Sequence, residues 1–182
     1  MSASTPALQP TLIDRLLEPY RVQLGTDFTA YRNHCVRVGN FCMALSAPEQ
    51  APEEKIATAA AFHDLGIWTD GTFDYLPHSL RLATGYLESV DRAGWIPEIT
   101  TMIAEHHKIT PYRDRPEWLV EPFRKADLVD LSLGLVRFGL DVRFIRKVRD
   151  SFPNSGFHKR LLELTWKRVR SDPFDPLPMM KW

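Results

Sequence analysis

The stretch "AAAFHDLGIW" (59–68) places a histidine and an aspartate side by side where an apolar helix comes to its end. Alanines at 57, 59, 60 and 61 precede the pair, and their small side chains would let neighbouring helices approach closely. An imidazole and a carboxylate on the side that the pattern indicates to be buried need a reason. The pair is either an accident of a helix end or one part of a site, and the rest of the chain decides between these two interpretations.

The composition is that of a globular protein. At 182 residues the chain is long enough to bury a core without disulfides, so residues 1–182 are predicted to form one domain. Hydrophobic residues make up 44% of the chain, and 23 basic side chains balance 23 acidic ones. Overall charge therefore indicates neither nucleic-acid nor membrane binding. Residues 137–170 carry ten Lys or Arg against three acidic residues, a pattern more typical of a solvated helix face or an oligomer surface than of a nucleic-acid interface.

The cysteines and the N-terminus favour a cytoplasmic protein. Cys35 and Cys42 lie seven residues apart in a helical pattern, and we interpret them as reduced core residues, not as a disulfide or a zinc pair. The first ten residues, MSASTPALQP, lack the basic and apolar regions of a signal peptide. No apolar run approaches the roughly 20 residues that span a bilayer. We expect a soluble protein with no membrane partner, and a homo-oligomer is left open.

Helical periodicity recurs along the chain, whereas the alternation typical of strands is almost absent. The predicted fold is all-α, a helical bundle of about seven helices. A first helix is expected to end near Gly25, with Thr26 as the N-cap of a second helix that runs to Leu45. The next is expected to begin at Pro52 and to stop at Gly66, before a loop, IWTDGTFDYLP (67–77). Later helices are expected at about 77–92, 97–108, 116–133, 141–151 and 156–171, followed by an extended proline-rich tail.

Several histidines and aspartates fall on faces that the apolar pattern would bury. His34 lies between Tyr31 and Val38 at three and four residues, the spacing of one helix face. Other residues with a comparable relation to apolar neighbours are His63, His78, His106, His107, Asp127 and Asp130. Each one alone has an ordinary explanation, as a satisfied core histidine or as an aspartate at the edge of the buried face.

Together these residues are harder to accommodate without a partner. Burying an uncompensated charge costs several kcal/mol, and a single domain is stable by only about 5–15 kcal/mol. The groups must therefore face water or compensate one another. A metal ion is an economical compensation, since neutral imidazole and ionised carboxylate are ordinary metal ligands. The number of candidates suffices for two metals, with Asp64 able to bridge them.

In this order and setting, the residues resemble the HD superfamily of metal-dependent phosphohydrolases. The signature of that family is a histidine on one helix, a His-Asp doublet at the end of the next, and a later helical aspartate. The matching segments are YRNHCVRV (31–38), AAFHDLG (60–66) and RKADLVD (124–130). PHSLRLATGYL (77–87) and IAEHHKI (103–109) are similar to the histidine segments of members that hold two metals. The resemblance covers about residues 28–133, and residues 134–182 would be C-terminal helices and tail.

The resemblance implies two metal sites that share one carboxylate. The ligands of the first would be His34, His63, Asp64 and Asp127. Those of the second would be Asp64 again, with His78 and His106. The metal would be Fe, Mn, Co, Ni or Zn, in one or two copies, because histidine and carboxylate ligands suit these ions better than they suit Mg²⁺.

Three further residues receive expected roles. Asp64 and His107 are the candidates for direct catalysis, and His107 is also open as a further ligand or as a residue that orients one. Lys108 is the expected phosphate contact, with a solvated helix-end charge as the alternative. Asp130 matches no ligand position, and we expect it to hydrogen-bond to a ligand or to lie on the helix surface.

The activity that the resemblance implies is hydrolysis of a phosphoester of a small molecule, a nucleotide or a related compound, by a metal-activated hydroxide. The first alternative is a mixed-valence di-iron oxygenase, similar to the inositol and phosphonate oxygenases that share this ligand set. Ile67 weakens the inositol assignment, since a lysine closely follows the doublet in that enzyme. A hydratase or nitrile-type hydrolase is a second possibility, and a non-catalytic binding module of the same fold is a third.

Overall fold

Every regular element that the structure describes is helical. The structure is a computed structural model, and it describes residues 8–47, 53–174 and 179–180. Within these ranges seven α-helices have ten residues or more, in agreement with the all-α prediction. The helices are α1 (Pro10–Leu17), α2 (Arg21–Leu24), α3 (Phe28–Leu45), α4 (Glu53–Phe62), α5 (Gly66–Thr69), α6 (Leu76–Ser89), α7 (Ile96–Glu105), α8 (Val120–Leu131), α9 (Val142–Ser151) and α10 (Phe157–Ser171).

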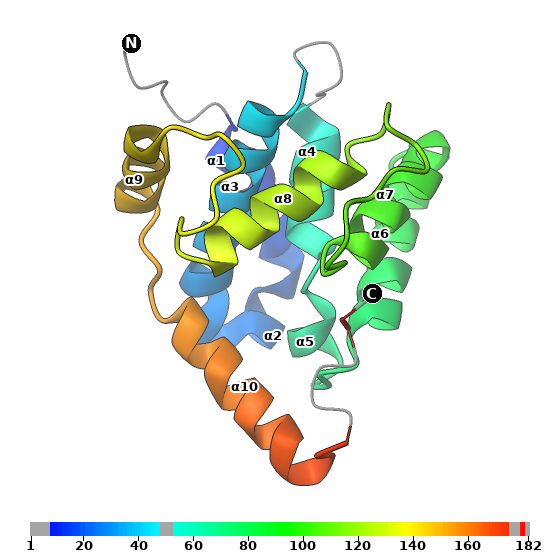
Figure 1. The fold of residues 1–182 in the computed structure, drawn as a ribbon. Coiled ribbons are helices and arrows are strands. Elements are labelled where there is room, and N and C mark those ends of the chain that lie inside the picture. The colour runs from blue at the N-terminus through cyan, green and yellow to red at the C-terminus, as the bar shows by residue number, and fades with distance from the viewer. Residues whose placement is uncertain (1–7, 48–52, 175–178, 181–182) are drawn as a thin grey trace.

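The long helix α3 forms the centre of the bundle. It packs against α8 and α4, and Figure 1 shows it behind α8 and beside α4. Tyr31, Cys35 and Phe41 on α3 are fully buried, and so is every side chain of α4 from Ile56 to Phe62. The cysteines are free and buried, as the sequence predicts. Because the alanines of α4 are small, α4 offers little side-chain bulk between α3 and its other neighbours.

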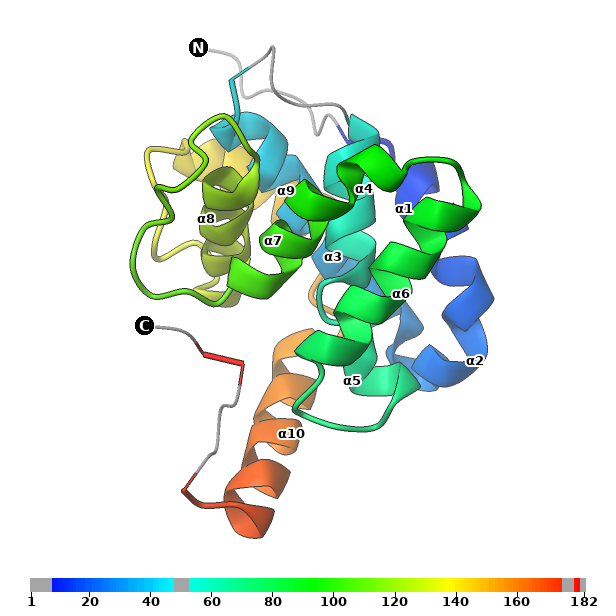
Figure 2. The ribbon, with the colours of Figure 1, turned by 90° about the vertical axis from the view of Figure 1, so that its right-hand side faces the viewer.

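Two further helices cover the other side of α4. The helices α6 and α7 pack against each other and against α4, and Figure 2 shows them together in front of it. The helix α7 also contacts α8, so α3, α4, α7 and α8 surround one interior. This arrangement determines where side chains from the ends of α4 and α7 meet.

The chain turns sharply where α4 gives way to the one-turn helix α5, and Gly66 permits the turn. A Cβ atom at Gly66 would lie 2.5 Å from the carbonyl oxygen of Tyr75, closer than any side chain allows. The Gly66 amide donates a hydrogen bond to Ser79 Oγ at 3.0 Å. The end of α4 therefore lies directly against the start of α6.

The helix α10 begins in the core and then extends away from the bundle (Figure 2). Its first residue, Phe157, is buried, and its ring stacks on His34 with the centroids 4.0 Å apart. Near the C-terminus, Met179 is buried against Ile67 and Tyr75. Met179 thus contacts the segment that follows the His-Asp doublet in the sequence.

The first predicted helix is interrupted in the structure. The helix α1 ends at Leu17, the residues Glu18–Tyr20 form a 3₁₀ turn, and α2 follows. Pro19 accounts for the break, because proline lacks an amide hydrogen and crowds the preceding turn. The prediction that Thr26 is an N-cap is also wrong. Thr26 lies in the 3₁₀ turn Gly25–Asp27, and α3 begins at Phe28 without a side-chain cap.

Other boundaries also differ from the prediction. The helix α4 ends at Phe62, not at Gly66, and the predicted loop 67–77 begins inside α5. The helices α6 and α7 end at Ser89 and Glu105, each three residues earlier than expected, and α8 begins at Val120, four residues later than expected. Pro52 and half of the proline-rich tail, namely 175–178 and 181–182, lie outside the described residues.

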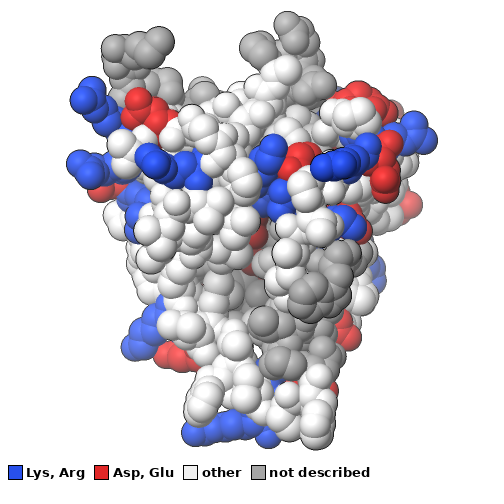
Figure 3. Space-filling model, viewed as in Figure 1, with Lys and Arg blue, Asp and Glu red and all other residues white. Residues whose placement is uncertain are grey.

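The basic C-terminal segment faces solvent along α9. Arg143, Arg146 and Lys147 are exposed, and Figure 3 shows basic side chains at the upper left, where Figure 1 places α9. This exposure supports the interpretation of a solvated helix face. Among the described residues, no helix has the length and apolarity that crossing a bilayer requires.

Candidate metal centre

Buried imidazoles and carboxylates from four parts of the bundle meet in its interior. We refer to these residues as the central cluster. Its members are His34 in the middle of α3, His63 and Asp64 just after α4, His106 just after α7, and Asp127 on α8. Each is at most 3% exposed, so the cluster must be compensated from within the protein or by a bound ion.

The doublet enters the cluster because α4 ends at that point. The His63 amide still donates a helical hydrogen bond to the Ala59 carbonyl oxygen at 3.0 Å, whereas the Asp64 amide donates to Tyr31 Oη at 3.3 Å. Neighbouring side chains on a regular helix diverge. Leaving the helix lets both side chains of the doublet turn toward α3 and α8.

The three imidazoles of the central cluster have a fixed tautomer. His34 Nδ1 lies 2.7 Å from Asp130 Oδ2, His63 Nδ1 lies 2.8 Å from the Ala60 carbonyl oxygen, and His106 Nδ1 lies 2.6 Å from the Ile103 carbonyl oxygen. Each of these partners can only accept a hydrogen bond. The proton of each neutral ring is therefore on Nδ1, and the lone pair is on Nε2.

The lone pairs converge on one another and on the carboxylates. His34 Nε2 lies 3.0 Å from His63 Nε2, and His63 Nε2 lies 3.4 Å from Asp64 Oδ2. Asp127 Oδ1 lies 3.6 Å from His34 Nε2 and 3.8 Å from His63 Nε2. Ligands about 2.0–2.2 Å from a common ion are separated by roughly 3.0–3.5 Å in tetrahedral or octahedral geometry. The four side chains that the sequence assigned to a first metal are thus at distances close to those of a coordination shell.

A second group of ligand atoms lies on the other oxygen of Asp64. Asp64 Oδ1 is 3.3 Å from His106 Nε2, and the ligand-type atoms of Asp64, His106 and His107 all lie within 4.8 Å of one another. The same 4.8 Å limit holds for His34, His63 and Asp64. Asp64 is thus common to two groups that could each hold a metal ion, and the second group contains His107 where His78 was expected.

One oxygen of each carboxylate of the central cluster lacks a donor. Asp64 Oδ1 and Asp127 Oδ1 are buried without a hydrogen-bond partner among the described residues. Burial raises the pKa of Asp127 from 3.8 to about 7. Burial also raises the pKa of Asp64, but His63 and His106 outweigh it and bring that pKa well below its ordinary value. Burial lowers the pKa of His63 to about 3, so its imidazole is neutral at pH 7. The residues therefore suit a cation, which would supply the positive charge that they face.

An ion pair outside the central cluster holds His34 in place. Asp130 accepts hydrogen bonds from His34 Nδ1 and from Arg37 Nε and Nη2, the latter two at 2.6 and 2.7 Å. Burial raises the pKa of Asp130, but the bonds from His34 and Arg37 outweigh it and lower that pKa. The hydrogen-bonding role predicted for Asp130 is confirmed. Sequence reasoning missed Arg37, although its position three residues after His34 on the buried face was a usable signal.

His107 lies beside the central cluster and is held by a tyrosine. Its Nε2 atom is 2.8 Å from Tyr75 Oη, and its Nδ1 atom is 3.8 Å from Asp127 Oδ2. Its side chain is 16% exposed, against 1% or less for the other three imidazoles of the site. Burial lowers the pKa of His107 well below 6.5. Sequence reasoning missed this role of Tyr75, because its contact with His107 arises from the tertiary fold.

His78 does not join the central cluster in the structure. Its Nδ1 atom lies 2.8 Å from Asp70 Oδ1, and its side chain is 31% exposed. Arg81 binds the same carboxylate oxygen at 3.0 Å. The first turn of α6 is fixed against Gly66, and from there the His78 side chain reaches the loop and not the interior. Of the expected second set of ligands, the structure therefore brings together Asp64 and His106 but not His78.

Lys108 is likewise directed elsewhere. Its Nζ atom lies 3.7 Å from Glu105 Oε2, which agrees with the alternative of a solvated helix-end charge. Arg124 is buried and binds Glu121 and the Lys108 carbonyl oxygen. Trp68 packs on Tyr31 and donates to Asp27, so it is a packing residue of the fold.

The chain was compared with models of known protein families, with curated proteins and with solved structures, and none of them matches. The likeness to HD-type sites therefore rests on the ordered residues and on the buried cluster that the fold builds from them.

Proposed function

We propose that this protein is a metal-dependent hydrolase that cleaves a phosphoester of a small molecule at the central cluster. One observation carries the proposal. Three imidazole Nε2 atoms and two carboxylates converge in a buried space, and two of the carboxylate oxygens have no donor. Buried carboxylate oxygens without a donor are costly in a protein interior, and a bound cation would compensate them.

The ligand chemistry favours a divalent transition metal. Neutral imidazole and carboxylate suit Mn, Fe, Co, Ni and Zn ions. Both cysteines are buried in the hydrophobic core and are not among the cluster residues. His34, His63, Asp64 and Asp127 would hold one ion, and Asp64 with His106 and His107 would hold a second.

The chain's own residues would orient the substrate and move the proton. A divalent ion held here would lower the pKa of water toward neutrality and offset phosphoryl charge. In hydrolysis the water oxygen forms a new P–O bond and loses a proton, the P–O bond to the alcohol breaks, and the alcohol oxygen takes up a proton. Where only the first ion is bound, His107 is not a ligand and would carry the proton from the water to the alcohol oxygen, because it is the most exposed imidazole of the site and Tyr75 fixes its ring.

A second candidate function is the addition of water to a neutral carbon–nitrogen multiple bond. The observation in its favour is that no Lys or Arg is among the described residues that line the pocket beside Asp64 and His107. The di-iron oxygenase has less support, since His78, which was expected to complete the second set of ligands, binds Asp70 instead. A non-catalytic binding module does not require buried acceptor groups without donors beside a pocket, so this alternative has less support.

The test is metal analysis of protein purified without added metal, followed by activity on phosphomonoesters. We expect one or two equivalents of a divalent transition metal and metal-dependent release of phosphate. Protein that binds no such metal at micromolar concentration would contradict the proposal. Iron together with O₂ consumption and no phosphate release would instead support the oxygenase, and hydration of a nitrile without phosphate release would support the second candidate.

A further inference from the structure

A small pocket opens directly beside the central cluster. Its volume is about 190 Å³, and Asp64 and His107 form part of its wall. Residues distant in sequence complete it, from Phe73 in the loop before α6 to Leu161 on α10 and Met179 near the C-terminus. Because the pocket ends at two of the proposed site residues, a substrate bound at the metal would place its organic part there.

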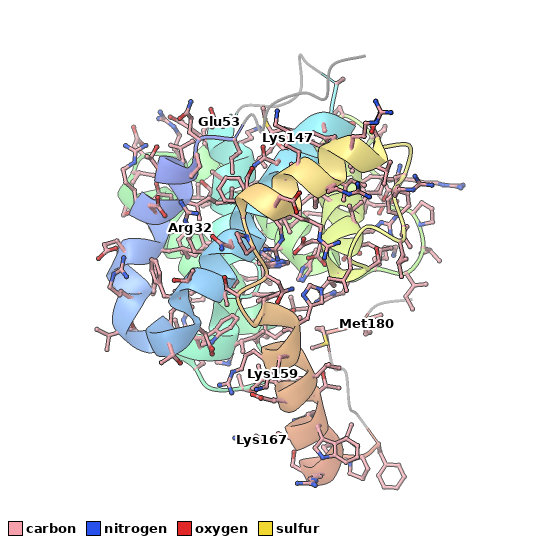
Figure 4. The ribbon with its side chains drawn as sticks, turned by 90° about the vertical axis from the view of Figure 1, so that its left-hand side faces the viewer. Arg32, Glu53, Lys147, Lys159, Lys167 and Met180 are labelled. Atoms are coloured by element: carbon pink, nitrogen blue, oxygen red, sulfur yellow. The ribbon has the colours of Figure 1, made fainter. Side chains whose placement is uncertain are left out.

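The wall of this pocket is apolar. Ile67 and Met179 are each 5% exposed and belong to one hydrophobic cluster, which Leu161 and Phe73 extend. Figure 4 shows Met180, another wall residue, beside the N-terminal half of α10. Lys159 and Lys167 project from the other side of that helix in the same view, and Lys159 is 82% exposed. Lys159 and Lys167 therefore do not line the pocket.

Few polar groups are available to a substrate. The Tyr75 hydroxyl is engaged by His107 Nε2 at 2.8 Å and lies 3.4 Å from His106 Nε2. Thr165 is the other uncharged polar side chain among the described residues of the wall. A sugar or a nucleobase would leave most of its hydrogen-bonding groups unpaired in such a pocket, which would weaken its binding.

The volume sets a further limit. Pockets that enclose drug-sized ligands measure about 300–1,000 Å³, against about 190 Å³ here. A single ring or a short alkyl chain fits this space, whereas a nucleoside would extend beyond it.

We infer that the substrate of the central cluster is an ester of a small, uncharged, largely apolar alcohol, and not a nucleotide. This inference rests on the proposed hydrolase function and specifies its substrate class. The phosphate would be met by the metal, and the apolar pocket would select the group attached to it.

The experiment compares phenyl phosphate with adenosine monophosphate on the metal-loaded full-length protein. We expect kcat/KM for phenyl phosphate to be higher by about ten-fold or more, as differences in pocket fit commonly produce. Leu161→Arg places a cation in the pocket and should lower that value by about ten-fold. Leu162→Arg is the matched control, because Leu162 is 71% exposed, and it should stay within about two-fold of the wild type.

A binding measurement separates this inference from the proposed function. Phenol, a neutral apolar probe, is titrated calorimetrically into wild-type and Leu161→Arg protein. If no phosphoester is hydrolysed but phenol binds and Leu161→Arg abolishes binding, the pocket assignment stands and the hydrolase proposal fails. If phosphoesters are hydrolysed with a preference for the nucleotide and Leu161→Arg changes nothing, the pocket assignment is overturned and the hydrolase proposal stands.

Discussion

Asp127 and Asp130 lie one turn apart on α8, and their surroundings are opposite. Each is 1% exposed. Asp130 faces the Arg37 side of α3 and accepts three hydrogen bonds, which lower its pKa. Asp127 faces the central cluster, where its Oδ1 atom has no donor, and burial raises its pKa to about 7. The fold supplies the partner of Asp130 from its own chain, while Asp127 Oδ1 has no such partner among the described residues and is suited to bind a cation.

The largest effect is expected from removing the carboxylate shared by both ligand groups. Asp64→Ala should abolish metal binding and activity, because His63 and His106 would lose the charge that lies 3.4 and 3.3 Å from their Nε2 atoms. Metal analysis and equilibrium dialysis measure the loss. Asp74→Ala is the matched control, since Asp74 is exposed in the following loop. Full metal occupancy in Asp64→Ala would remove the basis for a metal site here.

A large effect on stability is expected from a substitution at Asp130. Asp130→Asn leaves the Arg37 guanidinium buried without its counter-charge, which should destabilise the protein by about 3–5 kcal/mol. Because Asp130 also fixes His34, metal affinity should fall by about 10–100-fold. Denaturant unfolding with and without metal measures both quantities. Asp150→Asn, at an exposed carboxylate on α9, is the control, and an equal effect there would show that the Arg37 pair is not responsible.

The same substitution of asparagine for aspartate at Asp127 should stabilise the metal-free protein, whereas at Asp130 it destabilises the protein. Because the pKa of Asp127 rises from 3.8 to about 7 on folding, its contribution to stability is complete below pH 3.8 and is lost as the pH rises through 7. Metal-free Asp127→Asn should therefore exceed the wild type in stability by about 1–3 kcal/mol at pH 8, and by less at pH 5. Unfolding curves at both pH values test this, and a wild type more stable than the variant at pH 8 would contradict it.

The smallest effect is expected at His78. Because its imidazole binds Asp70 outside the central cluster, His78→Ala should change stability by no more than about 0.5 kcal/mol and leave metal content unaltered. His106→Ala, made in parallel, should reduce metal content. If His78→Ala also loses one equivalent of metal, the side chain moves into the site when metal binds, and the ligand set inferred from the family likeness is restored.

The comparison also indicates why some site residues were predictable and others were not. His34, His63 and Asp127 stand out in the sequence because polar side chains interrupt apolar helical faces. Periodicity assigns a residue to a face, but it does not say which other helix that face meets. The sequence therefore could not separate His78 from His106, since both follow apolar stripes. Gly66 decides the position of His78 by fixing α6 against the end of α4, and that contact is tertiary.

The sequence by itself determined the all-α class, most helices and most of the residues from which the site is built. These features follow from local periodicity, which depends only on residues that are near one another in the chain. Only the tertiary structure decided that Asp130 pairs with Arg37, that Tyr75 holds His107, and that His78 and Lys108 point elsewhere. The reason is that these contacts depend on how helices distant in sequence are packed. The doublet at the end of α4 can be recognised in the sequence, but its convergence with α3, α7 and α8 is a property of the fold.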